Sequence, residues 1–151
     1  MRRVPSGAFC FFRVRLGKEG FLMEQEGIVS VWTGVFESDK ALWDYAGYMD
    51  GTDLITPFSR DFFGGSDCYP FDEDLWERSV HEFTEDPETL VRPYSEGTAI
   101  GPELKKLFPQ GLSRACNAAI LVYDYLYNED KSPCIPDGPV RFLAAVPYDK
   151  G

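Results

Sequence analysis

The segment IVSVWTGVF, at Ile28–Phe36, carries the clearest β-strand pattern in the chain. β-branched and aromatic residues dominate it, and these residues favour strands because their bulk fits a pleated, half-buried surface. Apolar side chains would fall on both faces of such a strand. That pattern is typical of a central strand covered by other elements, so we expect this segment to lie inside a sheet.

Two helices are expected next along the chain. Ser38 is a good N-cap, because its side chain can accept a hydrogen bond from the first helical turn. Apolar residues follow at i, i+3, i+4 and i+7, one face of an amphipathic helix: Leu42, Tyr45, Ala46 and Met49. Thr56 and Pro57 then resemble an N-cap followed by proline at the first helical position, which predicts a short helix over 57–63.

The second half of the chain holds three expected strands. The segment 75–83 alternates apolar and polar residues, and we interpret it as a strand. Ala118–Tyr127 is a second strong strand, and Val140–Val146 is a third. The last two strands, joined by a connection rich in proline and glycine, are expected to form a final hairpin.

A loop and one further helix are expected between these strands. Residues 84–99 contain two prolines and many polar groups, so they are expected to be largely loop. Pro102–Phe108 is expected to be a helix that Leu112–Asn117 resumes after an interruption. The resulting order is β-α-α-(β)-α-β-β. Mixed order of this kind indicates an α+β fold, a mainly antiparallel sheet with helices packed on one face.

Length and charge restrict the possible functions. The chain has 151 residues, of which 44% are hydrophobic, enough for one domain with its own core. Its formal net charge is −10. A surface of that sign repels phosphate backbones and disfavours nucleic acid as a direct partner, while it suits a basic protein. No apolar run approaches the roughly 20 residues needed to cross a bilayer, so no membrane association is expected.

The charge is unevenly distributed along the chain. Residues 1–22 hold five basic side chains and one acidic one, a charge of +4, which leaves −14 for the remainder. We therefore divide the chain into a basic N-terminal appendage at 1–22 and a single domain at 23–151. The alternative is that Phe9–Leu16 forms an extra N-terminal strand of the same domain.

The sequence contains no recognisable catalytic, zinc-binding or nucleotide-binding motif. The single histidine, His81, would have to serve any Ser-His-Asp or Cys-His arrangement, and no nucleophile signature accompanies it. The four cysteines form no CxxC pair, which excludes the usual zinc pattern. Neither a P-loop nor a GxGxxG motif occurs. No enzyme activity, catalytic residue, metal or cofactor is therefore expected.

Acidic and aromatic residues interleave over 67–77. Carboxylates there could bind a metal or serve a small enzyme, but no EF-hand pattern occurs, and a solvated acidic face is the simpler explanation. Phe71 and Trp76 could equally be core residues. Acids that steer a basic partner, beside aromatics that supply contact area, fit these residue types best. The predicted partner-binding residues are Asp67, Tyr69, Asp72, Glu73, Asp74, Trp76 and Glu77.

The sequence resembles the bacterial immunity protein 22 family. The matching segments are Val29–Ser38, Leu42–Tyr45, Pro57–Phe62, Asp72–Glu77 and Asn117–Tyr125. The likeness extends over roughly residues 27–147 and does not cover residues 1–22. These motifs are structural, namely strand, cap and helix, and they supply no catalytic residues.

The resemblance implies a cytoplasmic antidote that binds and blocks a cognate bacterial toxin. The acidic charge of the chain separately makes a basic nuclease one candidate for that toxin. It does not identify the toxin. A general interaction or regulatory domain with a different partner remains an alternative. A small carboxylate-dependent enzyme that uses the 67–77 acids is a second one.

Overall fold

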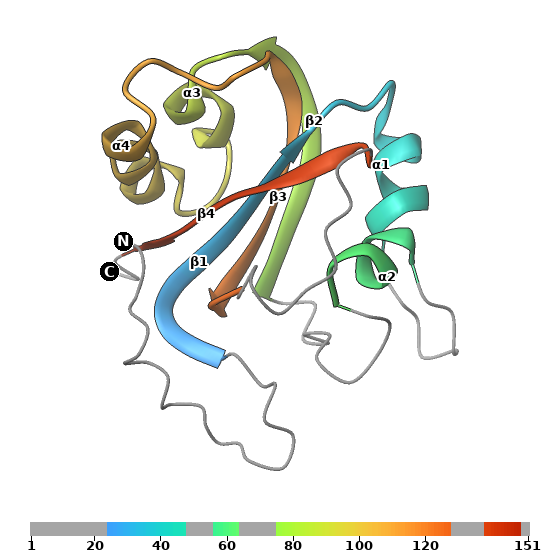
Figure 1. Ribbon diagram of the computed structural model, residues 1–151, viewed down its shortest axis with the longest axis horizontal. Coiled ribbons are helices and arrows are strands. Elements are labelled where there is room, and N and C mark those ends of the chain that lie inside the picture. The colour runs from blue at the N-terminus through green and yellow to red at the C-terminus, as the bar shows by residue number, and fades with distance from the viewer. Residues whose placement is uncertain (1–23, 48–55, 64–74, 128–137, 149–151) are drawn as a thin grey trace.

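The structure is a computed structural model that describes residues 24–47, 56–63, 75–127 and 138–148 (Figure 1). The division at residue 22, and the alternative strand at Phe9–Leu16, lie outside the described residues. The order of elements is β-α-α-β-α-α-β-β, and the fold is α+β, as the sequence predicts. None of the helices in these ranges is long and apolar enough to cross a membrane.

Within the described residues, four strands form one antiparallel sheet in the order β2-β3-β1-β4. They are β1 (Glu24–Gly34), β2 (Trp76–Thr84), β3 (Cys116–Tyr125) and β4 (Val140–Pro147). β1 lies between β3 and β4, which confirms the central position predicted from its apolar faces. The strand predicted at 75–83 is also confirmed, as β2, and it lies at an edge of the sheet.

The predicted final hairpin is wrong. β4 pairs with β1, with Trp32 opposite Phe142, so β1 separates the last two strands. Tight hairpins use connections of about two to five residues, whereas residues 126–139 separate β3 from β4. A connection of that length leaves the chain free to reach a strand other than its neighbour in sequence.

The first two helices agree with the sequence analysis. They are α1 (Asp39–Ala46) and α2 (Pro57–Phe63). The Ser38 hydroxyl accepts a hydrogen bond of 3.1 Å from the Ala41 amide, which confirms the predicted cap. Among the residues predicted to face inward, Leu42, Tyr45 and Ala46 are buried, while Met49 lies outside the described residues.

The second pair of helices was only partly predicted. They are α3 (Pro87–Val91) and α4 (Gly97–Leu107), and both occupy part of the segment expected to be loop. Asp86 followed by Pro87 is an N-cap and first-position signal that the expectation of a loop overlooked. α4 begins five residues before Pro102 because Gly97, Ile100, Gly101 and Leu104 bury one continuous face.

The expected helix resumption at Leu112–Asn117 is also wrong. Gly111 has a left-handed backbone with φ of 95°, which turns the chain away from the axis of α4. The Leu112 amide then donates a hydrogen bond of 2.7 Å to the Glu85 carbonyl. This contact leads the chain to the end of β2 and into β3, which begins at Cys116.

Helices cover both faces of the sheet, not one face as expected (Figure 1). Trp32, Ile120 and Val122 pack with α1 and α2 in one core. Their neighbours in sequence point the opposite way, and Val31 and Leu121 pack with α3 and α4 in the other. A strand that is apolar on both faces requires a covering layer on each, so the pattern of β1 already contradicted a one-sided sheet.

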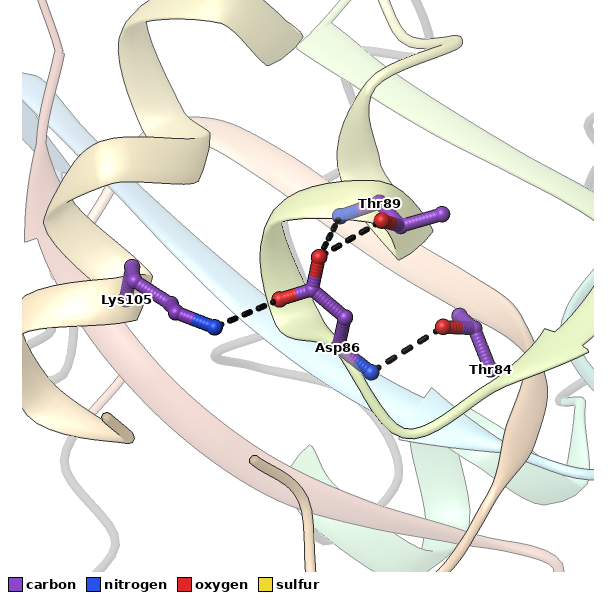
Figure 2. Close-up of polar contacts among 4 residues, drawn as sticks. All are labelled: Thr84, Asp86, Thr89 and Lys105. Carbon is purple, nitrogen blue, oxygen red and sulfur yellow. Dashed lines mark hydrogen bonds and ion pairs between the residues drawn. The ribbon is translucent and has the colours of Figure 1, made fainter. Parts of the chain in front are cut away.

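Asp86 connects β2, α3 and α4 (Figure 2). Its Oδ2 accepts hydrogen bonds from the Thr89 amide (3.3 Å) and the Thr89 hydroxyl (2.6 Å), and thereby caps α3. Its Oδ1 accepts one of 3.1 Å from Lys105 of α4. Its own amide donates to the Thr84 hydroxyl at the end of β2 (3.0 Å). Asp86 therefore contacts the end of β2 and both helices of this layer.

Candidate functional site

A shallow hollow of about 380 Å³ lies at the outer edge of β2. Residues from both faces of that strand line it, together with one residue of α1 and two from the connection between α3 and α4. They are Trp43, Trp76, Glu77, Arg78, Ser79, His81, Pro93 and Tyr94. The hollow therefore straddles the sheet edge, with α1 on one side of β2 and the α3–α4 connection on the other.

Arg78 lies between two tryptophan rings on the α1 side of the hollow. The central carbon of its guanidinium is 4.5 Å from the centre of the Trp43 ring and 4.9 Å from that of Trp76. Both distances are within the range of cation–π attraction. Trp76 is 6% exposed and belongs to the core, whereas Trp43 is 46% exposed. Arg78 thus joins a buried ring to an exposed one.

Tyr94 forms the opposite wall of the hollow. Its hydroxyl lies 3.1 Å from the carbonyl oxygens of both Ser79 and Ala119, and it accepts a hydrogen bond of 3.1 Å from the Ser79 hydroxyl. Burial raises the pKa of Tyr94. These contacts tie the α3–α4 connection to β2 and β3, so this wall has a fixed position.

Ser79 and His81 form a polar pair on the same wall. The Ser79 Oγ lies 2.6 Å from Nε2 of His81, whose ring meets Tyr94 edge-on at 5.7 Å. A serine beside a histidine resembles a nucleophile with its base, but a catalytic histidine is normally oriented by a third group. In the part of the chain that the structure describes, no carboxylate contacts this ring, and Ser79 is already bonded to Tyr94.

The Glu77 carboxylate is held by hydrogen bonds from other residues of the domain. Its carboxylate accepts hydrogen bonds from the Tyr123 hydroxyl (2.6 Å), the Ser95 hydroxyl (2.5 Å) and the Ser95 amide (3.0 Å to Oε1). Burial, and then the hydrogen bond with Glu77, raise the pKa of Tyr123. This carboxylate therefore connects β2, β3 and the α3–α4 connection.

The backbone edge of β2 is partly closed. The Val80 amide donates a hydrogen bond of 3.1 Å to the Asp39 carboxylate at the start of α1. The register between β2 and β3 also shifts between Val80 and Thr84. Both features oppose the addition of another strand to this edge, because an added strand needs free amides on a regular partner. The hollow therefore presents side chains at its surface and gives limited access to the backbone of β2.

The structure places two of the seven predicted partner-binding residues, Trp76 and Glu77, at this hollow. Trp76 is a buried core residue and Glu77 is held by internal hydrogen bonds. The other five lie outside the described residues: Asp67, Tyr69, Asp72, Glu73 and Asp74.

Sequence reasoning missed Trp43, Arg78 and Tyr94. A signal was present for Trp43, because it follows Leu42 and therefore lies off the apolar face of its helix. Nothing comparable marked Arg78 or Tyr94, whose roles depend on which elements pack beside β2.

The described residues show no group of three or more histidine, cysteine, aspartate or glutamate side chains placed to hold a metal. Cys116, in the same ranges, is a free, buried thiol. The hollow is lined by tryptophan, arginine and tyrosine side chains, residue types that are enriched among the energetically dominant residues of protein interfaces.

A family model described as Immunity protein 22 matches residues 29–149. Neither a search of curated proteins nor a search of solved structures found a match.

Proposed function

The chain belongs to the Immunity protein 22 family, and on that premise we propose that it neutralises a cognate bacterial toxin by binding it in a stoichiometric complex. Family membership is the observation that carries this proposal. The protein acts by occupying the toxin and not by catalysis. It works in the cytoplasm, where a cell needs protection from such a toxin.

The charge of the chain supports a basic toxin, and a nuclease is the favoured class. Nucleases must hold phosphates and are therefore often basic, and a protein of net charge −10 attracts them over long range. An inhibitor of this kind needs a rigid surface more than a reactive group. The hollow at β2, with walls fixed by internal hydrogen bonds, provides such a surface.

Growth rescue tests the proposal. The toxin domain encoded beside this gene is expressed in a sensitive host, with and without this chain, and colony counts are compared. Rescue by this chain, together with a one-to-one complex on size-exclusion chromatography, is the expected result. A toxin domain of another class serves as control and should remain lethal. Growth arrest that persists although both proteins are soluble would contradict the proposal and favour a different partner.

The acidic segment Asp67–Glu77 is part of the same proposal, as an electrostatic guide for the toxin. Changing Asp72, Glu73 and Asp74 together to lysine should slow association and flatten its dependence on salt, because long-range attraction acts on encounter. Surface-bound kinetics at two ionic strengths measure both effects.

A matched control separates local from overall charge in this test. The exposed acids Glu26, Glu37 and Glu85, also changed to lysine, alter the net charge by the same amount at other places. A smaller effect than that of the 72–74 variant is expected. Equal slowing by both variants would assign the steering to net charge alone and remove the segment from the interface.

A further inference from the structure

We propose that β4 pairs antiparallel with the same strand of a second copy of this chain, so that two sheets join edge to edge in a symmetric dimer. In this pairing Phe142 lies opposite Ala145 of the second copy, and Ala145 lies opposite Phe142 of the second copy. The inference goes beyond the proposed function and does not rest on it, because it follows from the backbone and side chains of one strand.

The two edges of the sheet differ in how open they are. At β2 the Asp39 carboxylate already accepts a hydrogen bond from the Val80 amide. At β4, β1 lies on one side, and within the described residues no strand lies on the other (Figure 1). The outward amides and carbonyls of an edge strand are a template for pairing with another chain. The run from Phe142 to Val146 also carries no charged side chain to oppose such pairing.

Hydrogen bonds at both ends of β4 show which of its residues turn their backbone outward. At one end, the Tyr148 amide donates to the Gly27 carbonyl (2.9 Å). At the other end, the Val35 amide donates to the Pro139 carbonyl (3.4 Å). Residues bonded to the neighbouring strand alternate with residues that point away from it, so the direction follows by counting inward from each end. The residues in the middle of β4 that point away from β1 are Phe142 and Ala145.

The spacing of these two residues selects a second copy of β4 as the partner. The register between β1 and β4 shifts between Val31 and Trp32, where Leu143 is the extra residue of β4. Phe142 and Ala145 are therefore three positions apart, whereas outward residues of a regular strand are two apart. A regular strand from another protein would match one of these positions and miss the other. A second β4 has the same spacing, so both positions match.

The side chains of β4 are complementary in this register. Each large apolar side chain lies opposite an alanine of the second copy, since Phe142 meets Ala145 and Leu143 meets Ala144. Phe142 packs on the core beneath α1 and α2, and Leu143 packs on the core beneath α3 and α4. All four side chains are half-buried in one copy, so joining the edges removes further apolar surface from water on both faces of the sheet.

Charge opposes this dimer at long range but not at the contact. Arg141 is the charged residue within β4, and in this register the two copies of Arg141 lie towards opposite ends of the paired strands. Each chain has a net charge of −10, however, so the two copies repel each other. Salt screens exposed charges that are more than about 10 Å apart at 0.1 M ionic strength. The dimer should therefore become tighter as the salt concentration rises.

The dimer is compatible with one toxin for each chain. β4 and the hollow at β2 lie at opposite edges of the sheet, with β3 and β1 between them. Pairing at β4 leaves the hollow of each copy open. Self-association is also measured without toxin, so failure of the proposed function would leave this inference standing, and failure of this inference would leave the proposed function standing.

Sedimentation velocity of the full chain over a range of concentrations tests the dimer. The mass should rise from 17.1 kDa towards twice that value, and the dissociation constant should fall with added salt. Ala145→Pro should raise the dissociation constant about tenfold or more, because it removes an amide that points away from β1. Ala145→Ser keeps that amide and is the matched control, with an expected change below about threefold. Thermal melting establishes that each variant is folded.

Two measurements on the native chain locate the contact without any variant. Hydrogen exchange of the segment 140–147 should slow as the protein concentration rises, because outward amides become hydrogen-bonded in the dimer. In a sample that mixes isotope-labelled with unlabelled chains, the Phe142 ring of one copy should give a nuclear Overhauser effect to the Ala145 methyl group of the other. An isotope filter restricts this signal to contacts between copies.

The outcomes decide both the dimer and its register. A chain that remains monomeric at every concentration overturns the inference. A dimer whose 140–147 amides exchange at the rate of the monomer also overturns it, as does a dimer that salt weakens, because a different surface then holds the copies together. A dimer that protects this segment but shows no contact between Phe142 and Ala145 of the second copy overturns the proposed register.

Discussion

Glu77 and Tyr123 form a hydrogen bond of 2.6 Å between β2 and β3, with the tyrosine hydroxyl as donor and the carboxylate as acceptor. Ser95 also donates hydrogen bonds to the Glu77 carboxylate, one from its amide and one from its hydroxyl. Glu77, which the sequence analysis predicted to bind a partner, therefore makes stabilising contacts inside the domain. Its carboxylate holds the α3–α4 connection against the sheet.

Removing that carboxylate should destabilise the domain. Hydrogen bonds to a charged group contribute about 1.5–3 kcal/mol, so Glu77→Ala should lower the free energy of unfolding by about that amount. Urea unfolding measures the change. Glu77→Gln keeps an acceptor and should cost less. Combining Glu77→Ala with Tyr123→Phe should cost less than the sum of the two single changes, because they break the same contact. Fully additive effects would show that the pair is not coupled.

Trp32 should be the most costly tryptophan to truncate. It is fully buried, and among the described residues four rings pack around it with centroids 5.1–5.9 Å away: Phe58, Phe62, Tyr127 and Phe142. Trp32→Ala should lower the free energy of unfolding by about 3–5 kcal/mol, because a large cavity remains. Trp43→Ala is the control and should cost less than about 1 kcal/mol, as expected for an exposed ring. Similar losses of unfolding free energy in the two variants would contradict the burial of Trp32.

Asp86 should stabilise α3 in a pH-dependent way. Hydrogen bonding from Thr89, the main cause, lowers the pKa of this carboxyl in the folded protein. A folded-state pKa below the unfolded value contributes stability that is present above about pH 4 and is lost as the pH falls further. Asp86→Ala should cost about 0.5–2 kcal/mol at pH 7, the usual value of a cap.

The Asp86 variants are compared by urea unfolding at pH 7 and pH 3. The difference between the native chain and Asp86→Ala should shrink at the lower pH. Asp86→Asn retains a capping oxygen but carries no charge, so it should be less stable than the native chain at pH 7 and closer to it at pH 3. A difference that stays constant with pH would show that the charge of Asp86 has no part in the cap.

Alkaline conditions should destabilise the protein through its buried tyrosines. Burial, together with hydrogen bonds to Asp61 and Asp124, raises the pKa of Tyr45 and Tyr148. Because these folded-state values exceed the ordinary value of about 10, the stabilisation is complete below that pH and is lost as the pH rises above it. The free energy of unfolding should therefore fall between pH 10 and 11.

Tyr45→Phe is the matched variant for the alkaline test. Each such tyrosine contributes a slope of at most about 1.4 kcal/mol per pH unit, and its replacement should flatten the curve by up to that amount. The replacement also removes the 2.7 Å hydrogen bond to Asp61, which lowers stability at neutral pH without affecting the slope. Parallel curves for the native chain and Tyr45→Phe would rule out this tyrosine as a source of the pH dependence.

The sequence alone determined the local elements. Ser38 marked the start of α1, Pro57 marked α2, and the apolar runs of β1 and β3 marked the two inner strands. Such signals are read over a few neighbouring residues, because capping bonds and side-chain periodicity are local. The same sequence also indicated the α+β class and the family.

Only the tertiary structure decided which elements meet. The pairing of β4 with β1, the second helical layer and the hollow around Arg78 all join residues that are distant in sequence. No local pattern shows that Tyr123 lies opposite the Glu77 carboxylate, because strand order and register arise from packing of the whole chain. The sequence by itself does not distinguish whether Trp76 and Glu77 contact a partner or stabilise the fold of the domain.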